Sequence, residues 1–285
     1  MNKTSTTLFL NPSSKNQKGQ KNWPCFCAAG FDEIISKSAD DLIAKVQNSA
    51  CETAVAVGGD GTINLVINGI MRSQAPKKLG VLYSGTSPDF CRFHQIATKP
   101  QDALAQLVNG KPHAIDICQI TYASKTPRYF ASSCNIGLGA QIAGTSNRVR
   151  KYLGDFCGTF FAALKAFMCV KPFSATLTVD GEIQRFPKVR HIAVLKNKFI
   201  ASGLYLDVPA KPDDGVLHVV LLPNLTLSGL LNIYKGKIPP SAQVFTCREV
   251  SVHTTPNQPA EFDGDPQGEG DVHIVCLPKR LELIK

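Results

Sequence analysis

Hydrophobic residues near the start of the chain occur both in short continuous runs and at helical spacing. Continuous apolar runs predict buried strands over residues 8–10, 25–28, 53–57 and 78–83. Apolar residues three or four positions apart predict helices around residues 42–46, 63–70 and 103–108. Strands that alternate with helices in this rhythm predict a parallel sheet covered by helices.

After residue 112 the pattern becomes β-rich. A tight hairpin is expected at Asp180-Gly181, between alternating runs at residues 176–179 and 182–186. Further strands are expected at 115–120, 190–195, 216–222, 244–253 and 272–277. One helix is expected to present Phe156, Phe160, Leu164 and Phe167 on one face. The fold class is therefore α/β plus β, with an α/β domain over residues 1–112 followed by a β-rich domain.

Composition narrows the function classes. The 285 residues are 44% apolar, enough for a sizeable core, and Lys plus Arg exceed Asp plus Glu by 31 to 22, a net charge of +9. That balance suits phosphate-bearing partners, although it is also common in proteins that need only solubility. Nucleic-acid binding is not expected, because the chain has one Trp and no dense basic run. No run of 18 apolar residues predicts a membrane span, and the start of the chain does not resemble a signal peptide.

The ten cysteines are scattered and form no Cys-x-x-Cys pair. We expect them to be reduced thiols of a cytoplasmic protein. Cys25 and Cys27 have a spacing that suits either a metal or alternation on a strand, and the second is favoured. Histidine spacing does not suggest a zinc enzyme.

The strongest local signal is a glycine cluster, Gly58-Gly59-Asp60-Gly61-Thr62, between a predicted strand and a predicted helix. Glycines allow close approach of a ligand, and a helix N-terminus favours a phosphate. Asp60 could hold Mg²⁺ or take a proton. The alternative is a plain strand–helix turn in which Asp60 or Thr62 caps the helix. Loops at 11–15 and 85–86 follow two other predicted parallel strands, where ligands bind in open α/β sheets.

Two acidic segments are further candidates. Residues 261–271 hold five carboxylates, which suits a proton acceptor or a metal site, or else a solvated β-turn. Asp213-Asp214-Gly215 precedes a predicted strand and is more often a plain turn than a metal site.

Taken together, these segments resemble the bacterial diacylglycerol kinase-like lipid kinases, related more distantly to sphingosine and NAD kinases. The resemblance covers nearly the whole chain in order. It rests on NPSS at 11–14, VGGDGTIN at 57–64, SGTSPDF at 84–90, the segment 151–167, Asn197, the segment 202–217 and FDGDP at 262–266.

The resemblance implies a fold and an activity. It implies a nucleotide-binding domain over residues 1–112, rejoined by 279–285, and a β-sandwich-like lipid-binding domain over 113–278, with the active site in the cleft between them. The implied activity is ATP-dependent phosphorylation of a hydroxyl on a diacylglycerol-like or other lipid, by a cytoplasmic protein peripheral to an anionic membrane. A homodimer is left open.

The resemblance also assigns residues. Positions that match ATP contacts are Asn11, Gly58, Gly59, Asp60, Gly61, Thr62, Asn64, Gly85 and Thr86. Asp214 and the carbonyl of Val216 match a structural Mg²⁺ site. Asp265 stands at the position of the base that accepts the substrate's hydroxyl proton, and Asp60 is the alternative base.

Departures from the family pattern keep other functions open. They are Lys15 for Gly, Leu65 for Glu, Pro88 for Asn, Lys211 for a metal-binding acid and Asp265 for Glu. We expect Leu65 to be exposed, roughly opposite the apolar stripe of its helix. A kinase of a soluble hydroxylated substrate, as in NAD kinases, and a nucleotide-binding protein with little catalysis are the alternatives.

Overall fold

The computed structural model describes residues 5–12, 20–122, 126–138, 171–201, 204–223, 226–263, 265–269 and 271–285. The expected helix around Phe156 to Phe167 and the departure at Lys15 lie outside these residues. The chain forms two compact units. The first comprises Met1–Ile117 with Pro278–Lys285, and the second comprises Cys118–Leu277.

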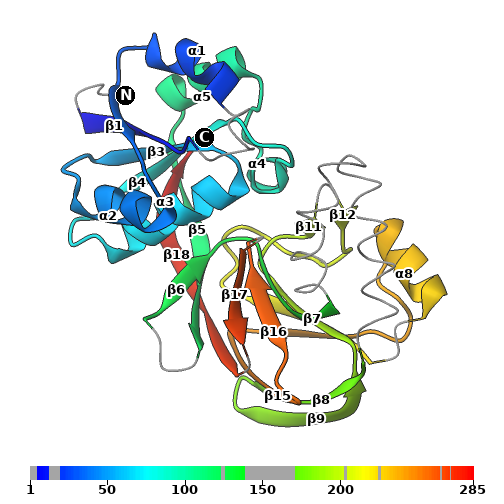
Figure 1. Cartoon of the computed structure of the whole chain (residues 1–285). Helices are drawn as coiled ribbons and strands as arrows, with labels where there is room; N and C mark the ends of the chain where they lie inside the picture. Colours follow the sequence, from blue (N-terminus) through cyan, green and yellow to red (C-terminus); the bar gives the residue numbers. More distant parts are fainter. Residues whose placement is uncertain are drawn as a thin grey trace. The chain divides into compact units, whose positions relative to one another are not determined.

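The first unit is an α/β unit with a parallel sheet in the order β2-β1-β3-β4. Figure 1 labels three of these strands, β1, β3 and β4. Its strands are β1 (Thr6–Leu10), β2 (Asp32–Ile35), β3 (Thr53–Gly58) and β4 (Lys78–Tyr83). Its helices are α1 (Trp23–Cys27), α2 (Ala39–Asn48), α3 (Asp60–Arg72), α4 (Asp89–His94) and α5 (Pro100–Asn109). The alternation of strands and helices that the sequence predicts is confirmed.

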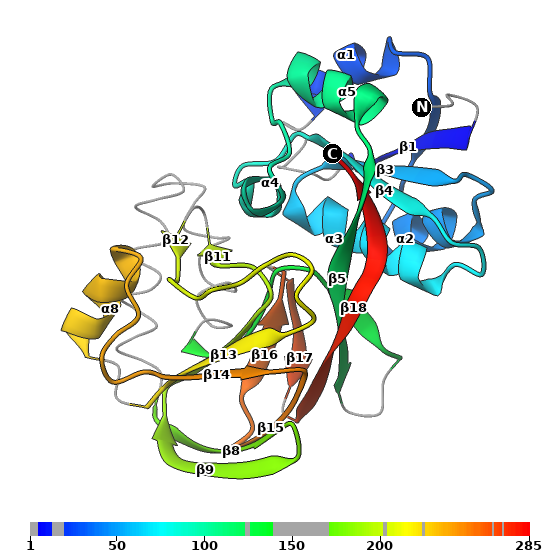
Figure 2. The same cartoon turned by 180° about the vertical axis from the view of Figure 1, so that it is seen from behind.

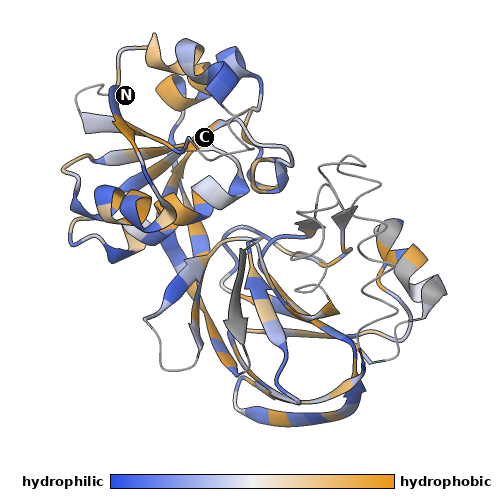
Figure 3. Cartoon of the chain, viewed as in Figure 1, coloured by the Kyte–Doolittle hydropathy of each residue, from blue (hydrophilic) through white to orange (hydrophobic). Residues whose placement is uncertain are grey.

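Continuous burial explains the central strands of this unit. Every residue of β1 and β3 is buried, as expected for parallel strands with both faces covered. The helices α2 and α3 instead carry both hydrophobic and hydrophilic residues, and they bury the apolar set (Figure 3). The predicted periodicity of residues 42–46 and 63–70 is thereby confirmed.

Two long strands have residues in both units. They are β5 (Pro112–Tyr122) and β18 (Val272–Ile284), and they pair with one another, side by side in both views (Figures 1 and 2). β18 also pairs in parallel with β4, with Leu283 opposite Leu79.

The second unit is an antiparallel β-sandwich. One layer is the six-stranded sheet β14-β13-β10-β7-β16-β17, and the other contains β18-β15-β8-β9. The strands are β6 (Arg128–Phe130), β7 (Ser133–Gly137), β8 (Phe173–Val179), β9 (Glu182–Val189), β10 (His191–Leu195), β11 (Phe199–Ala201), β12 (Leu204–Tyr205), β13 (Leu217–Leu222), β14 (Gln243–Cys247), β15 (Glu249–Thr255), β16 (Pro259–Phe262) and β17 (Asp265–Glu269), and the helix is α8 (Leu227–Tyr234).

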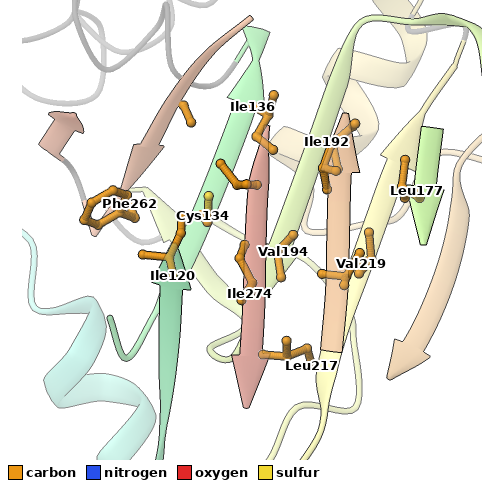
Figure 4. Close-up of a cluster of buried hydrophobic side chains, with 14 of the residues drawn as sticks. Ile120, Cys134, Ile136, Leu177, Ile192, Val194, Leu217, Val219, Phe262 and Ile274 are labelled. Carbon is orange, nitrogen blue, oxygen red and sulfur yellow. The ribbon is translucent and has the colours of Figure 1, made fainter. Parts of the chain in front are cut away.

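A single buried cluster fills this sandwich. Inward-facing side chains of both sheets meet in it, among them Ile136 and Ile192 from one sheet and Leu177 and Ile274 from the other (Figure 4). Alternation of buried and less buried residues along β8 is the expected pattern for such a sheet. The expected fold class, α/β followed by a β-sandwich-like domain, is confirmed.

Several predicted elements are wrong in detail. Residues 25–28 were expected to form a strand, but they lie in and just after helix α1, which Pro24 starts near its first position. The strand β2 was missed, because its residues Asp32–Ile35 are mostly exposed and carry two acids. The strand expected over 244–253 is two strands that break at Arg248. The hairpin at Asp180-Gly181 is confirmed, with both residues at positive φ.

Among the residues that the structure describes, no helix is both long and apolar enough to cross a membrane. All eight cysteines within the described ranges are free thiols.

Candidate functional site

The turn from β3 into α3 is built around glycine. Gly59 is the residue that caps α3, so the alternative in which Asp60 or Thr62 caps the helix is wrong. The side chain of Thr62 lies against Gly58, where an added Cβ would come within 2.3 Å of Thr62 Oγ1. Thr62 Oγ1 also accepts a hydrogen bond from Asn11 Nδ2 at 3.2 Å, which joins the end of β1 to this turn.

The loop after β4 touches the same turn. A Cβ on Gly85 would lie 2.5 Å from the Cα of Gly59 and 2.5 Å from the hydroxyl of Tyr83. The backbone N–H of Ser84 donates to the carbonyl of Gly58 at 2.8 Å. The structure therefore brings together Asn11, the glycine cluster and Gly85, all at the carboxyl ends of parallel strands.

Asp60 is the carboxylate of this group of loops. It is half-buried, and its Oδ1 accepts a 3.4 Å hydrogen bond from the backbone N–H of Phe90 at the start of α4. Burial and then the charge of Asp60 raise the pKa of Tyr83 and of Cys91 above their usual values. These raised pKa values keep both neighbours of Asp60 neutral at neutral pH.

Other predicted residues of the first unit lie around this turn. Asn64 is half-buried, and its Oδ1 accepts from Asn68 Nδ2 at 3.1 Å. Leu65 is half-buried rather than exposed as expected. Gly61 and Thr86 are exposed, and Pro88 takes the cap position of α4.

The three acidic side chains that the structure describes in the segment 261–271 have different surroundings. Glu261 is buried and accepts from Asn135 Nδ2 at 2.9 Å. Asp271 is exposed and pairs with His253 at 2.6 Å. Asp265 begins β17, and its side chain lies outside the described atoms. Glu261 and Asp271 therefore bind separate partners.

Asp263 has a structural role that its spacing does not reveal. Its carboxylate accepts backbone hydrogen bonds from Ala131 at 3.1 Å, Ser132 at 3.0 Å and Ser133 at 3.1 Å. Its backbone φ is +49°, a conformation that Asp tolerates better than most residues. Asp263 thus holds the turn between β6 and β7 against the hairpin that carries Asp265.

The pair Asp214 and Val216 already binds a cation of the chain itself. Lys196 Nζ lies 2.7 Å from Asp214 Oδ1 and 3.0 Å from the carbonyl oxygen of Val216. Burial alone would raise the pKa of Asp214, but the hydrogen bond and charge of Lys196 outweigh it and lower that pKa. Because both oxygens face an ammonium group, these residues as they stand do not fit a structural Mg²⁺.

Sequence reasoning missed Lys196, Asp263, Asn135 and Glu261 as interacting residues. Lys196 carried a signal: it follows the fully buried run of β10 without a turn, where a lysine needs a partner. The partners of Asp263 lie about 130 positions earlier in the chain, and spacing cannot reveal them.

Two family models match the chain. The model described as diacylglycerol kinase catalytic domain matches residues 5–120, and the model described as YegS C-terminal NAD kinase beta sandwich-like domain matches residues 132–285. The chain belongs to the bacterial diacylglycerol kinase-like lipid kinase family. Its kinase-family domain and the names of its relatives support a kinase.

Relatives support the same family. A protein of Staphylococcus carnosus (strain TM300), named "Putative lipid kinase", is 22% identical over 262 residues, which cover 88% of this chain and 82% of that protein. A protein of Staphylococcus epidermidis (strain ATCC 12228 / FDA PCI 1200) with the same name is 24% identical over 247 residues, 83% of this chain and 78% of its own.

Solved structures share the fold. A structure named "a putative diacylglycerol kinase from Bacillus anthracis str. Sterne" has a TM-score of 0.81 at 18% identity and covers 100% of this chain and 96% of its own. A second structure, of a diacylglycerol kinase from the same organism, has a TM-score of 0.72 at 16% identity, with 100% and 98% covered.

Proposed function

We propose that this kinase transfers the γ-phosphate of ATP to a hydroxyl group of a diacylglycerol-like or other lipid. The observation that carries the proposal is that three loops meet. The side chain of Asn11 donates a hydrogen bond to Thr62, and the backbone of Gly59 lies against that of Gly85. Helix α3 begins at this point and presents its positive end. A triphosphate is the ligand that such a backbone-lined helix N-terminus favours.

The proposed roles follow the chemistry of each group. The backbone N–H groups of Gly59, Gly61 and Gly85 and the side chains of Asn11, Thr62, Asn64 and Thr86 would contact ATP, together with Gly58. Mg²⁺ would accompany the ATP phosphates and neutralise their charge, and Asp60 is the carboxylate beside them. Catalysis of this kind consists mainly of positioning and charge neutralisation.

Asp265 is proposed as the base that takes the proton from the attacking hydroxyl. Support comes from its place in the motif FDGDP and from the fixing of its neighbour Asp263 by three backbone hydrogen bonds. A base must be held rigidly to reach the hydroxyl it serves. Asp60 remains the alternative base.

A lipid acceptor is supported by the family and by the names of the relatives. The net charge of +9 supports peripheral association of the protein with the anionic inner face of the membrane. A soluble acceptor is the second candidate, because the matched model of the second unit is described as NAD kinase-like.

The test incubates the full chain with radiolabelled ATP, Mg²⁺ and either a total lipid extract or NAD. Label in an organic-phase product supports the lipid kinase, and label in NADP supports the second candidate. Asp60→Asn should abolish either product, while Asp102→Asn, an exposed acid on α5, should leave it unchanged. Thermal stabilisation by ATP without any labelled product would instead indicate a nucleotide-binding protein with little catalysis.

A further inference from the structure

Lys196 is a buried cation in the second unit. It follows β10 directly, and its side chain is 2% exposed. Its ammonium group donates to Asp214 Oδ1 at 2.7 Å and to the carbonyl of Val216 at 3.0 Å. The backbone of Asp214 lies at the surface, but its side chain is only 22% exposed, so the contact between the two charged groups is largely shielded from water. A lysine is rarely buried to this extent unless it is paired, which makes the contact a built feature of the site.

The two oxygens that Lys196 binds are the two that the family resemblance assigns to Mg²⁺. A Mg²⁺ ion needs oxygen ligands at about 2.0–2.1 Å in near-octahedral geometry. An ammonium nitrogen already lies at hydrogen-bond distance from both oxygens, so the ion and Lys196 Nζ would compete for one position. The exposed Lys211 offers no oxygen ligand from its side chain.

We propose that Lys196 is the resident cation of the turn at residues 213–216 and takes the place of a structural metal. The turn includes Gly215 at a φ of +73° and leads into β13. Its fold then depends on a side chain of this chain and not on the supply of divalent cations.

The backbone of Lys196 joins this turn to a neighbouring loop. Its backbone N–H and that of Asn197 both donate to the carbonyl of Ser132, at 2.9 Å and 3.0 Å. Ser132 in turn donates its N–H to Asp263 at 3.0 Å. Lys196 therefore stands in a continuous set of hydrogen bonds that runs from the turn at 213–216 to the acidic hairpin.

The chain contains a matched control. Lys45 Nζ donates to Asp41 Oδ2 at 2.9 Å and to the carbonyl of Ile35 at 2.9 Å, which is the same pair of acceptor types. Its side chain is 32% exposed and that of Asp41 is 29% exposed. The two lysines thus differ mainly in burial, and loss of an exposed pair has little effect on stability.

The experiment measures the melting temperature of the full chain with added Mg²⁺ and with EDTA, without nucleotide or lipid. The wild-type value should be the same in both solutions. Lys196→Met should lower it by about 5 °C or more, while Lys45→Met should change it by about 2 °C or less. A Lys196→Met melting temperature equal to that of the wild type would overturn the proposal.

A second measurement does not depend on whether a Lys196 variant folds. The wild type is titrated with Mn²⁺ while electron paramagnetic resonance reports the free ion, again without nucleotide. We expect no Mn²⁺ binding that depends on Asp214. Binding that Asp214→Asn removes would show a metal at this turn and would overturn the proposal. Because neither experiment involves phosphoryl transfer, failure of the proposed function would leave both results interpretable.

Discussion

Replacing Gly85 by alanine tests the contact on which the candidate nucleotide site depends. The new Cβ would lie 2.5 Å from Gly59 Cα, whereas carbon atoms in contact are about 3.5–4.0 Å apart. The two loops must therefore separate by about 1 Å. The hydrogen bond from Ser84 to Gly58 is 2.8 Å long, and a shift of about 1 Å along it would break it. Overpacking of this kind costs about 1–3 kcal/mol of unfolding free energy.

The assay combines urea unfolding with the rise in melting temperature on adding ATP and Mg²⁺. Gly85→Ala should lower the unfolding free energy by that amount. It should also weaken ATP binding by about tenfold, a loss of about 1.4 kcal/mol of binding free energy, because the displaced loop no longer holds its N–H groups beside the phosphates. Gly61→Ala is the stability control, because no atom lies within 4 Å of its added Cβ, and it should not destabilise the chain. Wild-type stability in Gly85→Ala would refute the close contact of the loops. An unchanged response to ATP would refute the nucleotide role.

Three further predictions concern the base, the membrane and acid pH. Asp265→Asn should lower turnover by about 10²-fold with ATP affinity unchanged, measured by steady-state kinetics, and intact turnover would leave Asp60 as the base. The protein should sediment with anionic vesicles at low salt and leave them at high salt, and equal binding to neutral vesicles would contradict this. Burial lowers the pKa of His191 to about 4, so the unfolded chain takes up a proton first as pH falls below about 6.5. Stability should fall by about 3 kcal/mol between pH 6.5 and 4, less in His191→Gln, and urea unfolding of equal pH dependence in both would contradict it.

The sequence predicted the first unit well where burial is complete on both faces. The runs that form β3 and β4 have few other interpretations, and the helical spacing after residue 62 is regular. Prediction failed where an element is short or exposed. Three apolar residues after Pro24 suit a helical turn as well as a strand, and only Phe26 of that helix is buried. The edge strand β2 has no buried side chain, so its sequence shows no hydrophobic pattern typical of a strand.

The site was predictable to the extent that it is local in sequence. The glycine cluster and the loops at Asn11 and Gly85 follow parallel strands, so their meeting follows from the topology. The acidic residues behave differently because their partners come from distant strands. Asp263 and Glu261 look alike in the sequence. Asp263 nevertheless accepts backbone hydrogen bonds from a turn, whereas Glu261 accepts one from the buried side chain of Asn135.

The two lysines near the turn at 213–216 have a common electrostatic explanation. In the family pattern, two carboxylates and one Mg²⁺ would give this turn a net charge of zero. Here Lys211 replaces one of the acids, and Lys196 supplies a single positive charge to the remaining Asp214. The Asp214 carboxylate and the Lys196 ammonium group form a neutral pair, which keeps the cost of burying these two charges low, while the opposite charges of Asp213 and Lys211 are exposed to solvent. On this proposal, a lysine of the chain itself holds the turn that Asp214 and Val216 form, and no metal ion is needed to balance the Asp214 charge.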